Sequence, residues 1–168
     1  MEPLRLDPPQ PRRRVDVSVL IRDRLGRVLL VQPKHRSDMV LPGDGVHPKE
    51  SVSEAAARAL TDSMGMRRAT MGALLLEQHP ANLETGSAEA LAVVLDGGLM
   101  VSADAAALSL PIRTEAVDAF EWVPLDALSR YVLPVIEHRI RAAYAVALRG
   151  IRLQLAYVGE PADQLRAA

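Results

Sequence analysis

Residues 41–66 contain the side chains and turns of this chain that are best suited to phosphate chemistry. The run Pro-Gly-Asp-Gly at residues 42–45 lets the backbone approach a ligand closely. The helix expected after it presents free N–H groups and a positive dipole end at its N-terminus. Gly43, Asp44 and Gly45 are therefore candidate ligand- or phosphate-binding residues.

The helix that follows has the spacing of a metal site but few of the required acids. Mg²⁺ prefers oxygen ligands and keeps several waters, so two or three carboxylates and a substrate phosphate suffice to hold it. Acids at positions 59, 62 and 63 would converge on one helix face. The chain has Ala59, Asp62 and Ser63 there. Asp62 is thus the main candidate metal ligand and catalytic acid, and Asp44 is a weaker second ligand.

Glu50 and Arg58 form the second candidate pair in this segment. Glu50 precedes the expected helix, and Arg58 lies two turns along it, so the two can pair across the fold-back of the loop. Such a pair orients a loop, and a structural ion pair is the more ordinary interpretation than a catalytic one.

The helix that must position these residues is clearly delimited. Ser51 is a predicted N-cap with Glu54 three residues later, which is the spacing of a capping box, and Gly65 is the predicted stop. Before the helix we expect strands at residues 15–21 and 27–31, joined by a hairpin turn at 23–26. A third short strand is expected at 39–41, ended by Pro42-Gly43.

After Gly65 the pattern predicts strands at residues 69–76 and 89–95, the second ending in a turn at 96–98. A loop at 102–113, a strand at 116–123 and a short helix opening at Pro124 follow. A longer helix starts near Leu133, with Pro134 in its first turn, and closes at Gly150. Residues 151–158 form a possible edge strand. This order predicts an α/β or α+β layer fold, a mixed sheet sandwiched between helices.

Composition sets broad bounds on the class of protein. A chain of 168 residues suits one domain, here residues 15–158 between an extended N-terminal arm at 1–14 and a frayed tail at 159–168. A net charge of −1 gives no global attraction to nucleic acid or membranes. The chain has no cysteine, no apolar run of membrane-spanning length and no signal-peptide pattern, so we expect a cytoplasmic protein.

Residues 44–66 resemble a Nudix box, the signature of the Nudix hydrolase superfamily, written G-x5-E-x7-R-E-U-x-E-E-x-G-U with U aliphatic. With Gly65 as the final glycine, Glu50 and Arg58 fall on the first glutamate and the arginine. Leu60 and Met66 fill the apolar positions. The flanking order of strands and helices extends the resemblance over most of residues 15–148.

The same alignment identifies three departures from the pattern. Asp44 replaces the first glycine, Ala59 the glutamate after the arginine, and Ser63 the second glutamate of the later pair. In the family, the glutamates at the positions of Ala59 and Ser63 usually hold the catalytic magnesium. Glu115 lies where the family sometimes places a loop base.

The resemblance implies two functions of different classes. One is a divergent hydrolase of nucleoside diphosphates linked to a moiety X, using Mg²⁺ or Mn²⁺, with activity weakened, altered or lost. The other is an inactive Nudix-fold module that binds a nucleotide, another phosphorylated ligand or a partner protein, and needs no metal. A nucleotide-like small ligand is expected in both cases, and a homodimer is a further expectation from the family.

Overall fold

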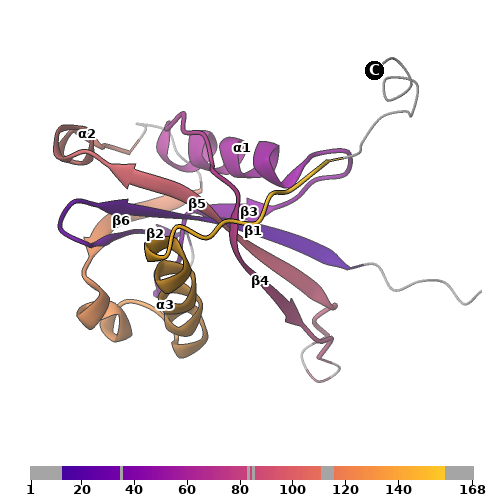
Figure 1. The fold of residues 1–168 in the computed structure, drawn as a ribbon. Helices are drawn as coiled ribbons and strands as arrows, with labels where there is room; N and C mark the ends of the chain where they lie inside the picture. The colour runs from indigo at the N-terminus through magenta and orange to yellow at the C-terminus, as the bar shows by residue number, and fades with distance from the viewer. Residues whose placement is uncertain (1–12, 35, 83, 85, 111–115, 158–168) are drawn as a thin grey trace, which may run out of the picture.

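The computed structural model describes residues 13–157 apart from 35, 83, 85 and 111–115 (Figure 1). Its elements, in chain order, are β1 (Arg14–Asp23), β2 (Val28–Pro33), β3 (Gly43–Gly45), α1 (Val52–Met64), β4 (Ala73–His79), β5 (Ala90–Met100), α2 (Ser102–Ala107), β6 (Val117–Val123), the 3₁₀ helix η1 (Leu125–Arg130) and α3 (Pro134–Leu148). No described helix is long and apolar enough to cross a membrane.

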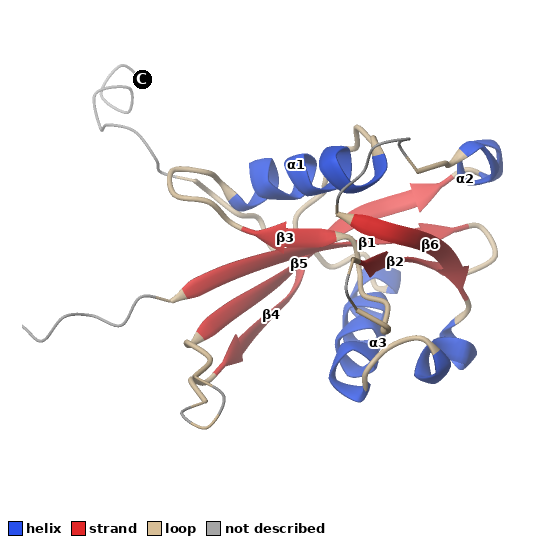
Figure 2. Ribbon diagram, turned by 180° about the vertical axis from the view of Figure 1, so that it is seen from behind, coloured by secondary structure: helices blue, strands red, loops and turns tan. Residues whose placement is uncertain are grey.

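A six-stranded mixed sheet forms the middle layer. Five strands follow the order β4-β5-β1-β2-β6, and β3 pairs with β1 off this path. The central strand β1 runs parallel to β5 and antiparallel to β2 and β3. Helix α1 covers one face of the sheet and α3 covers the other, as both views show (Figures 1 and 2). The predicted fold class is confirmed.

Side chains on the two faces of β1 pack in two separate hydrophobic cores. Val17, Val19 and Ile21 pack in the core under α1, while Leu20 packs with Ile140 of α3 in the other. Successive side chains of a strand point to opposite faces, so this alternation follows directly from the apolar run in the sequence. Buried apolar side chains therefore determine which side chains of β1 face α1 and which face α3.

The termini of α1 are confirmed as predicted. The Ser51 hydroxyl accepts from the Glu54 N–H, and the Glu54 carboxylate accepts from the Ser51 N–H, so both halves of the capping box are present. Gly65 ends the helix in the left-handed region, with φ of 63°. Helix α3 likewise starts with Pro134 in its first turn, as expected.

The strand predicted at residues 39–41 is wrong. Val40 makes one isolated bridge with Val31, and the strand forms instead as β3, which begins at Gly43, the glycine predicted to end it. Gly43 lies so close to β1 that an added Cβ would be 2.1 Å from the Val17 carbonyl oxygen. Only glycine permits this approach, so a residue typical of turns is here required by a strand.

The turn predicted to end a strand at residues 96–98 is also wrong. β5 continues to Met100, and its register with β1 shifts where Leu20 pairs with Asp96 and Ile21 with Gly98. Gly97 is the extra residue of this bulge, and a Cβ there would be 2.6 Å from the Ile21 side chain. Gly97 and Gly98 therefore form a bulge within β5, and β5 stays paired with β1 on both sides of it.

Three smaller expectations are corrected. Residues 102–107, predicted as loop, form the short helix α2. The strand predicted from residue 69 starts at Ala73. In the segment predicted as an edge strand, residues 151–157 make one isolated bridge, between Leu153 and Ala73, and residue 158 lies outside the described residues.

Arg152, in the segment after α3, reaches the fully buried Asp96 of β5. Its Nε and Nη2 lie 2.7 and 2.6 Å from Oδ2 of Asp96. Arg22 of β1 approaches Oδ1 of the same carboxylate at 3.3 Å. A buried carboxylate requires such partners, because an uncompensated charge in the interior is strongly destabilising.

Candidate functional site

Arg58 on α1 holds the loop that connects β3 to the helix. Its Nε and Nη2 lie 2.8 and 3.1 Å from the two carboxylate oxygens of Glu50. Its Nη1 donates to Asp44 at 2.7 Å, and Nη2 also donates to the Gly45 carbonyl at 2.8 Å. The predicted pairing of Glu50 with Arg58 is confirmed, and Asp44 joins it. We call this set of four residues the Arg58 clamp.

Hydrogen bonds in the clamp stabilise its charged forms. The Arg58 hydrogen bonds, and then the N–H of His47, lower the pKa of Glu50 from 4.5 to about 2. Burial alone would raise the pKa of Asp44, but hydrogen bonds from Arg58 and the Gly45 N–H outweigh it and hold the pKa below its ordinary value. Glu50, followed by Asp44, raises the pKa of Arg58. The clamp is therefore fully ionised near neutral pH.

The helix positions of the expected metal site are packed rather than charged. Ala59 and Ser63 are both buried, at 4% and 6% exposure. The Ser63 hydroxyl donates to the Ala59 carbonyl one turn earlier, so it is used within its own helix. Asp62 is exposed and lines a cavity beside these two residues.

That cavity, of about 310 Å³, lies on the α1 face of the sheet, and we call it the α1-face cavity. Its lining residues are Val31, Pro33, Val40, Gly43, Asp44, Ala59, Asp62, Ser63, Ala116 and Val117. Within the described part of the chain, no three His, Cys, Asp or Glu side chains are grouped so that they could hold a metal ion. Its two described carboxylates are Asp44, which is paired with Arg58 at 2.7 Å, and Asp62, which has an interaction of its own, so neither is an uncommitted ligand for magnesium. Glu115, the predicted loop base, lies outside the described residues.

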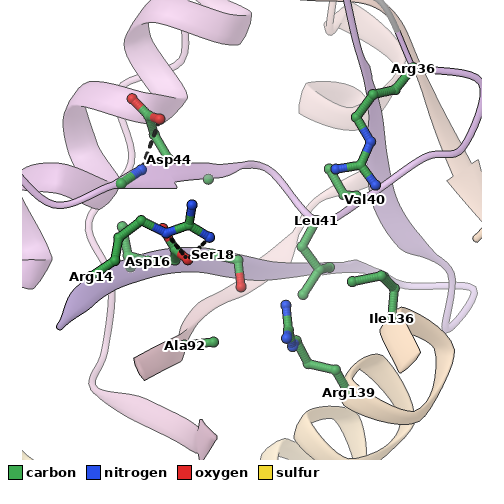
Figure 3. Close-up of a pocket in the computed structure, with 13 residues that line it drawn as sticks. Arg14, Asp16, Ser18, Arg36, Val40, Leu41, Asp44, Ala92, Ile136 and Arg139 are labelled. Carbon is green, nitrogen blue, oxygen red and sulfur yellow. Dashed lines mark hydrogen bonds and ion pairs between the residues drawn. The ribbon is translucent and has the colours of Figure 1, made fainter. Parts of the chain in front are cut away.

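A second cavity, of about 480 Å³, lies on the other face, and we call it the α3-face cavity (Figure 3). It is lined by Arg14, Asp16, Val17, Ser18, Arg36, Val40, Leu41, Gly43, Asp44, Gly45, Ala92, Ile136 and Arg139. All three candidate ligand-binding residues of β3 line this cavity. Val40, Gly43 and Asp44 line both cavities, so β3 is the wall between them.

Sequence reasoning did not bring the arginines of the α3-face cavity together. Arg14 belongs to a basic run at residues 12–14 that could contact phosphate but is more typical of a solvated surface, and Arg36 and Arg139 have no distinctive local pattern. They come from β1, the loop after β2, and α3, so only the folded chain brings them together. No local signal in the sequence could have found this group.

With the layered fold and the clamped loop established, the family assignment follows. The chain belongs to the NUDIX domain family, which matches residues 12–145. The resemblance inferred from the box is thereby confirmed. No curated protein matches the chain.

Solved structures show the same fold at low identity. A MutT protein from Methanosarcina mazei Go1 is 22% identical, with 85% of this chain and 99% of that chain covered and a TM-score of 0.63. A NUDIX hydrolase from Nitrosomonas europaea is 15% identical over 89% and 100% of the two chains, with a TM-score of 0.66. The NUDIX domain of Shewanella oneidensis NrtR, complexed with ADP ribose, is 17% identical over 80% and 88%, with a TM-score of 0.62.

Proposed function

We propose that this Nudix-domain protein binds a phosphorylated, nucleotide-like ligand, and that its metal-dependent cleavage of phosphoanhydrides is weak or lost. The observation that supports this most is the contrast along α1. The Arg58 clamp is complete, whereas the helix positions beside Asp62 are filled by the buried Ala59 and Ser63.

The chemistry of hydrolysis explains why this contrast matters. A catalytic metal ion supplies charge neutralisation and an activated water, and its carboxylate ligands fix it in place. Alanine ligates nothing, and the Ser63 hydroxyl already donates to its own helix. Loss of two carboxylates from one site lowers the rate by at least about 10³-fold.

The retained residues support ligand binding. In our proposal Gly43, Asp44 and Gly45 form the wall against which the ligand lies, and Glu50 with Arg58 keeps that wall in shape. The Shewanella oneidensis NrtR domain, complexed with ADP ribose, is a relative in fold that holds a nucleotide-like ligand of this class. Homodimer formation and a cytoplasmic location remain predictions.

A second candidate is a divergent hydrolase, and one observation favours it. Asp62 and Ala116 line the same cavity, and Glu115 directly precedes Ala116 in the chain. In this alternative Asp62 and Glu115 are the catalytic acids, Asp44 is the weaker metal ligand, and Mg²⁺ or Mn²⁺ is the cofactor.

Metal titration distinguishes the two candidates. The purified protein is titrated with Mn²⁺ and with Mg²⁺, alone and with a panel of nucleoside diphosphates, by calorimetry. We expect nucleotide binding without a metal requirement and no turnover. Tight metal binding together with hydrolysis that is lost in Asp62→Ala would instead establish the hydrolase.

Restoring the missing acids provides the converse test. We expect Ala59→Glu with Ser63→Glu to lower the melting temperature in chelator, because two carboxylates are brought together at buried positions. Millimolar Mg²⁺ should then raise the melting temperature of the double variant but not of the wild type. Equal metal response in both proteins would show that the wild type already has a metal site.

A further inference from the structure

The two cavities on either side of β3 differ in the charges they offer a ligand. The charged residues among the described lining of the α1-face cavity are Asp44 and Asp62, both acids. Asp44 is paired with Arg58 at 2.7 Å, and Asp62 has an interaction of its own. The described residues of this cavity thus offer a phosphate no basic side chain.

The α3-face cavity has the opposite character. Arg14, Arg36 and Arg139 reach it from three separate segments, and Figure 3 shows their guanidinium groups approaching from three sides. The acids of its lining are Asp16 and Asp44. Planar guanidinium groups present several N–H donors in a fixed fork, which matches the oxygens of a phosphate. This cavity therefore has the donors that the other one lacks.

Arg139 is held in position before any ligand arrives. Its Nε donates to Glu77 at 2.7 Å, and its Nη2 lies 2.9 Å from Nε2 of His79. Its side chain is 16% exposed. Nη1 has no hydrogen-bond partner among the described residues, which leaves a donor of a fixed, half-buried cation for a ligand. Because the side chain is already ordered, binding costs little further entropy.

Arg36 and Arg14 are more exposed and more easily redirected. Arg36 pairs with Asp38 at 2.5 Å, and Arg14 pairs with Asp16 at 2.8 Å. Each pair lies between residues two apart on the surface, where ion pairs contribute little stability. A phosphate can share these guanidinium groups or replace their surface partners at small cost.

We propose that the α3-face cavity binds the phosphate of the ligand without a metal ion, with Arg36 and Arg139 as direct donors and Arg14 completing the rim. The inference rests on the proposed function for the class of ligand. It adds a position for the phosphate. The phosphate lies on the opposite side of β3 from Asp62, away from the face of α1 that carries Ala59 and Ser63.

The test measures binding by calorimetry in chelator and again in Mg²⁺. Inorganic pyrophosphate is the probe that contains no base, and a panel of nucleoside diphosphates tests the full ligand class. We expect binding in chelator that weakens as salt increases. Arg139→Gln and Arg36→Gln should each weaken it at least about tenfold, because each removes charge-assisted hydrogen bonds.

Arg141→Gln is the matched control. Arg141 lies on the same helix and also pairs with an acid, Glu137, but it does not line the cavity. Its variant should bind within about twofold of the wild type. Thermal unfolding shows whether Arg139→Gln remains folded after losing its contact with Glu77. If Arg139→Gln does not remain folded, the inference is tested by the affinity of Arg36→Gln, whose side chain lies at the exposed rim of the cavity.

Three outcomes would overturn the inference. Nucleotide binding in chelator that is unchanged in both arginine variants would place the phosphate elsewhere, while the proposed function would stand. Nucleosides binding as tightly as their diphosphates would remove the role of the phosphate. If neither pyrophosphate nor any nucleoside diphosphate binds in either buffer, both the inference and the proposed function are wrong.

Discussion

Two parts of the segment over residues 43–63 are built on different principles. We call the loop at 43–50 with its partner Arg58 the first half, and positions 59–63 of α1 the second half. In the first half, shape depends on specific groups: Gly43 packs directly on β1, and Arg58 joins Glu50, Asp44 and the Gly45 carbonyl. In the second half, two small residues, Ala59 and Ser63, are buried beside the exposed Asp62. The loop architecture of this fold is thus intact in a chain whose helix carries no carboxylate at positions 59 and 63.

If the first half depends on shape, Gly43→Ala should have the largest effect. Its Cβ would be 2.1 Å from the Val17 carbonyl and 2.7 Å from the Ser18 Cα, so β3 would have to move off β1. We expect a loss of about 3 kcal/mol in unfolding free energy, measured by urea denaturation. Gly45→Ala is the control, because its nearest contact, Asp16, would be at 3.7 Å, and it should cost below about 1 kcal/mol. Equal effects would show that β3 does not need its close approach.

Arg58→Ala should have the next largest effect. It removes four hydrogen bonds and leaves the partly buried Glu50 carboxylate without its cation. We expect a loss of about 2 kcal/mol in unfolding free energy, with weaker ligand binding. Arg141→Ala, which removes an exposed pair with Glu137 and a hydrogen bond to the Leu125 carbonyl, should cost below about 1 kcal/mol. Similar losses in the two variants would mean that the clamp is merely a surface ion pair.

Acid should weaken the clamp in a defined direction. The pKa of Glu50 is lowered from 4.5 to about 2 in the folded state, chiefly by Arg58. Its contribution to stability is therefore complete above the unfolded value and disappears as the pH falls toward 2. The stability difference between wild type and Glu50→Gln should shrink between about pH 5 and about pH 2.5, as followed by urea denaturation. A constant difference over that range would contradict the pairing.

The smallest effect is expected in the second half, from Ser63→Ala. The hydroxyl donates to the Ala59 carbonyl within the same helix, and alanine has the higher helix propensity. We expect unfolding free energy to change by less than about 1 kcal/mol and ligand affinity to be unaltered. A clear loss of affinity or of metal response would show that Ser63 contributes to the site, and the two halves would then be less different than we infer.

The parts of the fold that sequence predicted are those with local causes. Ser51 with Glu54 defines a helix start, and Gly65 defines its end, without reference to the rest of the chain. Pro134 likewise marks the first turn of α3 through its own backbone geometry. Where a glycine serves a distant contact, as Gly43 does against β1 and Gly97 against Ile21, the local pattern of a turn was misleading.

The candidate site divides in the same way. The spacing of Glu50 and Arg58 predicted their pairing, because both lie in one loop and helix. Arg36 and Arg139 are far apart in the sequence, and they line one cavity only because α3 packs on the sheet. The partnership of Asp96 with Arg152 is equally non-local, and nothing near either residue indicates it.

The ion pair between Asp96 and Arg152 bears on the order in which the folded structure forms during synthesis. During synthesis, β5 and its buried Asp96 leave the ribosome well before residue 152 does. The partners that the carboxylate has among the residues made by then are the Gly98 N–H at 2.8 Å and Arg22 at 3.3 Å. The shorter contacts with Arg152 form after α3 is complete. A nascent chain that stops at the end of α3 would contain every described strand and helix and still lack Arg152, which makes the shortest ion-pair contacts with the buried Asp96. We therefore expect the sheet around Asp96 to gain part of its stability only after residue 152 has been made.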